Sequence, residues 1–241
     1  SNSKFLSSDI VTEFRGRGYE IRMYPLSFEE FMTNYNGTLS NGWKQYYTYG
    51  GLPVVSQIDD IEGKMNYLAE QKENVYINDV IERNNIKNDE ELRILVEIIA
   101  SNIGSLSNPT KLADTFESTR NIKIGNKTIN AYLKYLEEAF IIEKAKKYDI
   151  KGKKYIDTPS KYYFTDVGLR NSFVNYRQQE EGHIMENIIY NELVYMDYNV
   201  TVYNNNGKEI DLTETETYEL IHPDKISSLI IGSGLSLECA Y

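Results

Sequence analysis

The stretch "NDEELRILVEIIASNIG", residues 88–104, has the clearest helical pattern in the chain and opens the segment that decides the fold. Asn88 with Glu91 three residues later predicts a capping box at its start, and Gly104 predicts the end of the helix. Apolar side chains recur between them at helical spacing, at Leu92, Leu95, Val96, Ile99 and Ile103. We therefore expect an amphipathic helix with one buried face.

Two more helices follow in the sequence. Asn108 and Pro109 predict the start of the first, because proline is favoured at the first helical position, and Leu112 and Phe116 then face inward. The second begins near Lys127. Its apolar stripe consists of Ile129, Tyr132, Leu133, Leu136 and Phe140. Three helices in a row thus precede the first strand predicted in this segment.

Two strands and a short closing helix complete the segment. Residues 140–150 predict a strand, "KGKK" predicts a turn, and residues 155–173 predict the second strand followed by the helix. Three helices followed by a two-stranded ribbon is the order of a winged helix. We therefore predict a winged-helix domain at residues 85–175.

The segment before it is predicted to be mostly helical. Ser27 with Glu30 forms a capping box for a short helix, and the alternating residues 19–24 predict a strand before it. Residues 41–52 predict a short helix that ends at a glycine pair, and residues 60–83 predict a long one.

The segment after it carries acidic residues in a pattern that metal-dependent nucleases use. Residues 182–202 predict a helix leading into a strand, and residues 208–221 predict a second strand. Glu186 lies on the helix, whereas Glu209 and Asp211 share one face of the second strand. A carboxylate pair can hold Mg²⁺, so Glu186 and Asp211 are candidate metal ligands. No lysine follows two residues after an acid there, and the alternative is an edge strand with solvated charges.

Charge is distributed unevenly along the chain. The net charge is −10, yet residues 121–161 carry 10 Lys and Arg against 5 Asp and Glu. A basic middle inside an acidic chain favours a contact of this segment with double-stranded DNA. The candidate residues lie on the outer face of the third helix and on the ribbon: Lys127, Asn130, Lys134, Lys144, Lys146, Lys147, Lys151, Lys153 and Lys154, together with Lys161.

A second interpretation of the same lysines stays open. Glu137 and Glu138 lie on the third helix and oppose contact with phosphates. The ribbon would then be a solvated hairpin on a winged helix that serves as a protein–protein module.

Composition limits the remaining classes. Cys239 is the only cysteine and His183 and His222 are the only histidines, so neither an intrachain disulfide nor a thiolate zinc cluster is expected. No window approaches about 18 consecutive apolar residues, and no basic start precedes an apolar run, so we expect neither a membrane span nor a secretory signal. A cytoplasmic protein is the expectation.

Arg15 and Arg17 flank Gly16 between a predicted helix and the strand at residues 19–24. An exposed arginine at such a turn can reach a phosphate across a subunit interface. The alternative is a surface arginine pair near a turn. No Gly-x-x-x-x-Gly-Lys-Ser/Thr pattern occurs in the sequence, so no phosphate-cradling loop is expected in this chain.

The order of these elements resembles the C-terminal portion of a bacterial and archaeal group of AAA-superfamily ATPases that carry a conserved C-terminal domain of unknown function. The resemblance covers about residues 1–212. The motifs that carry it are the initial "SNS", "FRGR", "PLSFEEF", "YGGLP", "YINDVIERNNI", "YYFTDVGLRN" and "IMENIIYNEL" followed by "EID".

The resemblance implies a nucleotide and a metal in the full-length protein. That protein would bind and hydrolyse ATP with Mg²⁺ through a P-loop located before this chain, and no cofactor is expected in this chain itself. Arg17 would sense the γ-phosphate, with Arg15 as the weaker candidate, and the ATPase module would support self-association. The C-terminal part would have a restriction-endonuclease-like fold in which Glu186 and Asp211 match the acidic positions.

The expected fold class is therefore α+β and mainly helical, in four parts. These are the end of the ATPase module at residues 1–35, a helical connector at 36–84, the winged helix at 85–175, and a partial nuclease-like α/β domain at 176–241. Residues after "EID" do not match the group, so the nuclease-like domain is expected to be incomplete and inactive. Three functions follow in order: a DNA-linked ATPase, an ATP-dependent protein-interaction switch or scaffold, and a Mg²⁺-dependent nuclease.

Overall fold

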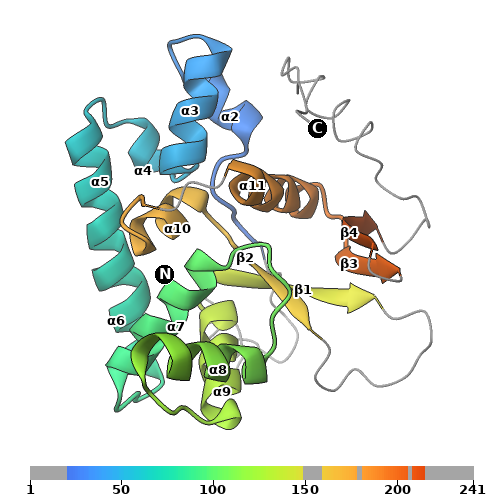
Figure 1. Cartoon of the computed structure of the whole chain (residues 1–241). Coiled ribbons are helices and arrows are strands. Elements are labelled where there is room, and N and C mark those ends of the chain that lie inside the picture. Colours follow the sequence, from blue (N-terminus) through green and yellow to red (C-terminus); the bar gives the residue numbers. More distant parts are fainter. Residues whose placement is uncertain (1–20, 149–158, 178–180, 206–207, 215–241) are drawn as a thin grey trace, which may run out of the picture.

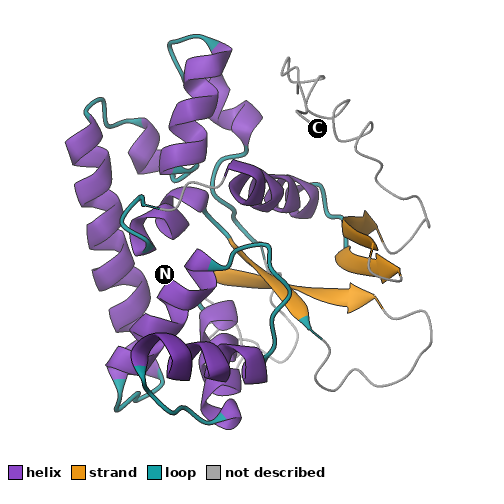
Figure 2. Ribbon diagram, in the orientation of Figure 1, coloured by secondary structure: helices purple, strands orange, loops and turns teal. Residues whose placement is uncertain are grey.

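The computed structural model describes residues 21–148, 159–177, 181–205 and 208–214. Within these residues the fold is α+β and mostly helical, as expected, with a small sheet among the helices (Figures 1 and 2).

The helical connector precedes the core of the molecule. Its elements are α3 (Leu39–Tyr49), α4 (Pro53–Ser56), α5 (Ile61–Glu70), the π-helical η1 (Gln71–Ile77) and α6 (Asn78–Arg83), and α2 (Phe28–Thr33) lies before it. The capping box at Ser27 is confirmed, because the Ser27 hydroxyl accepts from the Glu30 N–H while the Glu30 carboxylate accepts from the Ser27 N–H. The long helix at 60–83 is confirmed as α5, η1 and α6 in direct succession.

The expected order of three helices and two strands is confirmed. The elements are α7 (Asp89–Ser101), α8 (Pro109–Arg120), α9 (Asn126–Glu138), β1 (Ile142–Tyr148) and β2 (Ser160–Phe164), followed by α10 (Val167–Phe173). The Asn108 side chain accepts from the Lys111 N–H and caps α8. The predicted stripe of α9 is buried at Ile129, Leu133 and Leu136.

Two local predictions are wrong. Asn88 makes no capping hydrogen bond, because its backbone lies away from the extended conformation that an N-cap adopts, and the Glu91 carboxylate accepts from the Tyr132 hydroxyl instead. Residues 21–24 form no strand. Arg22 and Tyr24 pack their side chains onto later elements, as described below, and their backbone pairs with no described strand.

The sheet joins the ribbon to the C-terminal elements. These are α11 (Glu181–Tyr195), β3 (Val200–Asn205) and β4 (Lys208–Glu214), and the strand order is β2-β1-β3-β4. β1 pairs antiparallel with β2 over Ile142↔Phe164 to Lys146↔Ser160, and parallel with β3 at Lys147↔Val202. β3 and β4 form an antiparallel hairpin with an irregularity between Thr201 and Tyr203.

The hydrophobic core lies between the sheet and the helices. Figure 1 shows α11 on one side of the sheet and α7, α8 and α9 on the other. One continuous cluster of buried side chains runs from Ile77 in η1 to Val202 in β3, and it includes Phe116, Leu136 and Phe164. Because this core and the sheet both cross residue 175, the predicted winged helix and C-terminal domain pack as neighbours, and their division remains a prediction.

Candidate functional site

The outer face of α9 carries three of the residues that are predicted to contact DNA. Lys127, Asn130 and Lys134 are exposed, because the opposite stripe of the helix is buried. The Lys134 Nζ lies 3.6 Å from the Glu138 carboxylate one turn later, at the end of α9 that leads into β1. The charge of this face is therefore positive towards the start of the helix and mixed towards its end.

β1 adds two exposed lysines beside α9, against which it packs. Lys144 and Lys146 are two residues apart, so they lie on one face of the strand, and the Lys144 Nζ lies 5.9 Å from the centre of the Tyr162 ring. Of the other predicted lysines, Lys147 belongs to β1, whereas Lys151, Lys153 and Lys154 lie outside the described residues.

Lys161 does not belong to this basic face. Its position in β2 directs it to the opposite side of the sheet, where its side chain is only 3% exposed and its Nζ lies 2.9 Å from the Glu186 carboxylate of α11. The Tyr163 hydroxyl donates to the same carboxylate oxygen, Oε1. The His183 Nδ1 lies 3.9 Å from the other oxygen, Oε2.

Glu186 is therefore already bound by a lysine and a tyrosine, and a metal ion at this carboxylate would compete with the Lys161 ammonium group. Asp211 lies in β4, where only the backbone is described. Among the described residues no group of three or more His, Cys, Asp or Glu side chains is arranged to hold a metal ion. Arg15 and Arg17 lie outside the described residues.

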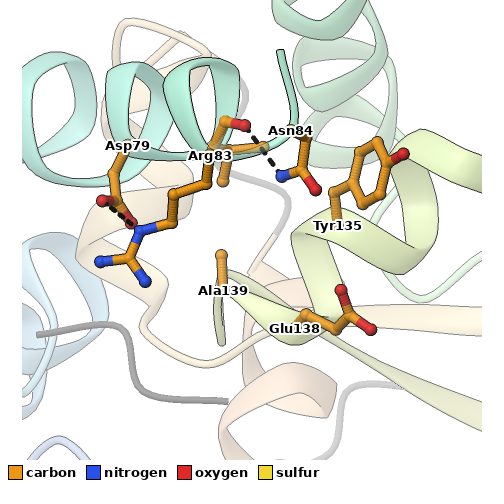
Figure 3. A pocket seen from close by; sticks show the side chains of 7 residues that line it. Asp79, Arg83, Asn84, Tyr135, Glu138 and Ala139 are labelled. Carbon is orange, nitrogen blue, oxygen red and sulfur yellow. Dashed lines mark hydrogen bonds and ion pairs between the residues drawn. The ribbon is translucent and has the colours of Figure 1, made fainter. Parts of the chain in front are cut away.

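A shallow hollow, partly open to solvent, lies between α6 and α9 (Figure 3). Tyr135 and Glu138 reach it from α9, while Asp79 and Arg83 form an ion pair at 2.6 Å on α6. Asn84, which follows α6, also lines the hollow, and its side-chain amide donates to the Val80 carbonyl. The hollow thus lies between the C-terminal end of α9 and helix α6 of the connector.

A buried carboxylate that the sequence analysis missed ties the connector to α10. Asp166 is fully buried and accepts backbone N–H groups from Gly51 at 2.8 Å and from Leu169 at 2.7 Å, with Leu52 and Gly168 as further donors. Burial raises the pKa of the Asp166 carboxyl to about 6, although the four backbone donors act to lower that pKa. The sequence signal that could have indicated this contact is the pair of motifs "YGGLP" and "FTDVGLRN", because Gly51 lies in the first and Asp166 in the second.

Further contacts of the same kind surround Asp166. Asn171 donates to the carbonyls of Tyr47 and Thr48 at 3.0 Å each, and the buried Arg170 Nε donates to the Ala100 carbonyl at 2.7 Å. In α11, Glu192 accepts the Phe28 N–H at 2.8 Å, and burial raises the pKa of this carboxyl. Short polar contacts therefore hold α2 against α11, and the α3–α4 part of the connector against α10.

Comparison with known proteins places the chain in a family. Residues 40–180 match the family described as Domain of unknown function (DUF8612), and the chain belongs to this family. The matched range runs from α3 through the three-helix segment and the β1–β2 ribbon to the end of α10, and so includes both sides of the Asp166 junction.

Two relatives extend the comparison beyond the family range. An uncharacterized protein of Haemophilus influenzae is 35% identical over 92% of this chain and 56% of its own length. An uncharacterized protein of Methanocaldococcus jannaschii is 30% identical over 80% of this chain and 45% of its own length. The chain thus spans about half the length of the curated relatives it matches. No helix among the described residues is long and apolar enough to cross a membrane.

Proposed function

We propose that this chain is the C-terminal portion of an AAA-type ATP-binding protein whose winged helix, residues 85–175, binds double-stranded DNA. The observation that carries the proposal is the exposed set Lys127, Asn130, Lys134, Lys144 and Lys146 on two adjoining elements, α9 and β1. A helix face flanked by a basic strand suits a duplex, because the lysines meet phosphates while Asn130 reaches base edges. ATP and Mg²⁺ belong, in this proposal, to the part of the longer protein that this chain lacks, with Arg17 as the phosphate sensor.

Removing two lysines of this face is expected to weaken duplex binding about 10-fold or more at low salt, and to lower the slope of log K against log salt by about 2. The variant is Lys134→Ala/Lys144→Ala, measured by fluorescence anisotropy with a labelled duplex over a series of salt concentrations. Each lost phosphate contact removes about one released counterion, which is why the slope and the affinity fall together.

The matched control is Lys44→Ala/Lys87→Ala, which removes two exposed lysines from α3 and from the segment before α7. Its net charge equals that of the test variant, so a general electrostatic effect would weaken both equally. Equal loss in the two variants, or no salt-dependent binding by the unaltered protein, would contradict the proposal.

A second function, an ATP-dependent switch that reorders a protein-interaction module, is favoured by the Asp166 and Glu192 contacts. These carboxylates hold the Gly51 and Phe28 backbones, so a shift of the connector is passed directly to α10, and a shift of α2 to α11. In the full-length protein, ATP should then alter protease cleavage between about residues 50 and 90. An unchanged cleavage pattern with ATP would remove the basis for this function.

A Mg²⁺-dependent nuclease is the least supported alternative. Lys161 and Tyr163 already bind the Glu186 carboxylate, so a metal ion there would have to displace a buried ammonium group from it. We therefore expect calorimetric titration with Mn²⁺ to give the same heat for the unaltered protein and for Asp211→Asn. A saturable heat that disappears in Asp211→Asn would instead support a metal site at Glu186 and Asp211.

A further inference from the structure

The corner between α9 and β1 holds a phenylalanine in an unfavourable backbone conformation. Phe140 has a φ of 54°, which is rare for a bulky side chain. The Phe140 and Ile141 N–H groups donate to the carbonyls of Glu137 and Leu136, and the Thr165 hydroxyl donates to the Phe140 carbonyl at 2.6 Å. Such a conformation persists only where its surroundings hold it in place.

Arg22 supplies part of these surroundings from far away in the sequence. Its guanidinium carbon lies 5.1 Å from the centre of the Phe140 ring and 4.8 Å from that of Tyr24, and it forms an ion pair with Glu143 of β1. The Tyr190 hydroxyl of α11 donates to the other Glu143 oxygen at 3.2 Å. The Tyr24 ring packs against Tyr195 of α11, with ring centres 4.6 Å apart.

The geometry of these contacts differs from that of an ordinary surface ion pair. The Arg22 side chain is 38% exposed, but the Glu143 side chain is only 16% exposed and has a second partner in Tyr190. A planar guanidinium can stack on rings and pair with a carboxylate at the same time, which lysine cannot do equally well. The Arg22 side chain thus connects the segment before α2 to the turn after α9 and to β1, while Tyr24 and Glu143 extend these contacts to α11.

We infer that Arg22 is a positioning residue: through it, the segment before α2 sets the relative placement of α9 and β1 and so regulates the proposed DNA-binding face. Lys134 and Lys144 lie on the two sides of this corner. A change in the corner alters the spacing of the lysines without removing any of them. The DNA part of this inference rests on the proposed function, whereas the corner itself can be tested without DNA.

The first measurement is amide hydrogen exchange of residues 139–143 in Arg22→Ala. We expect exchange there to accelerate by about 5-fold or more, with exchange in α7 unchanged, because only the local opening equilibrium shifts. Glu143→Gln should reproduce this acceleration, and Arg22→Lys should give an intermediate value. The matched control is Arg120→Ala, which removes an exposed arginine and its 2.9 Å ion pair with Glu97 and should leave residues 139–143 unaffected.

The second measurement is duplex affinity against salt. Arg22→Ala is expected to weaken binding about 5-fold with an unchanged salt slope, because a positioning residue neutralises no phosphate itself. A slope lowered by about 1 would make Arg22 a direct phosphate contact and overturn the inference. Unchanged exchange at residues 139–143 would also overturn it. If the unaltered protein binds no duplex, the proposed function fails, and the exchange result alone decides the role of Arg22.

Discussion

Replacing Gly168 by alanine is expected to destabilise the protein by about 3 kcal/mol, although alanine is the better helix former. Gly168 lies in α10, and a Cβ added there would stand 1.9 Å from the Tyr49 carbonyl oxygen and 2.7 Å from the Gly50 nitrogen. Both are backbone atoms and cannot rotate away. Helix α10 would have to withdraw from α3, which would stretch the hydrogen bonds of Asp166 to Gly51 and of Asn171 to Tyr47.

The matched control is Gly182→Ala near the start of α11, where an added Cβ meets nothing within 4 Å. The lost flexibility of the unfolded chain and the gain in helix propensity should stabilise this variant by up to about 1 kcal/mol. The two alanines therefore change stability in opposite directions, and urea unfolding followed by circular dichroism measures both. Two effects of the same sign would show that α10 is not packed against the connector as described.

Much of the fold could be predicted from the sequence, because its signals are local. The Ser27 capping box, the Asn108-Pro109 helix start and the α9 stripe each depend on side chains within a turn or two of one another. Asn88 has the same local signature as Ser27, but the tertiary contact of Glu91 with Tyr132 prevailed there. Pairing of β1 with β3 could not be predicted, since it joins residues more than 50 positions apart.

The candidate site could be predicted only in part, for a related reason. The spacing of α9 correctly placed Lys127, Asn130 and Lys134 outside. Composition groups Lys161 with the other lysines of the ribbon, but side chains alternate between the two faces of a strand. Which face is buried depends on the pairing of β2 with β1 and on the packing of α11, and neither is visible in the local sequence. Asp166 resembled an ordinary helix cap, and its bond to the Gly51 N–H, 115 residues away in sequence, carries no local signal.

Replacing Asp166 by alanine is expected to cost about 3–5 kcal/mol of the free energy of unfolding, the largest effect that we predict for a single side chain. The change leaves the N–H groups of Gly51 and Leu169 buried without an acceptor and also removes the N-cap of α10. Asp166→Asn retains one acceptor oxygen but turns an amide N–H₂ towards a backbone donor. Its free energy of unfolding should therefore decrease by less than that of Asp166→Ala, but by a measurable amount. Equilibrium urea unfolding at about pH 7 compares the three proteins.

The dependence of this effect on pH has a definite sign. The pKa of Asp166 is about 6 in the folded protein against an ordinary value of 3.8, so the folded state binds more protons than the unfolded state between these values. Stability from this group is therefore greatest below about pH 3.8, decreases by about 3 kcal/mol in total as pH rises through about 6, and is constant above that. The difference in unfolding free energy between the unaltered protein and Asp166→Asn isolates this change, because the other carboxyl groups are common to both. A difference that instead grows as pH rises from about 4 to 6.5 would show that the four backbone donors outweigh burial and keep the carboxylate charged.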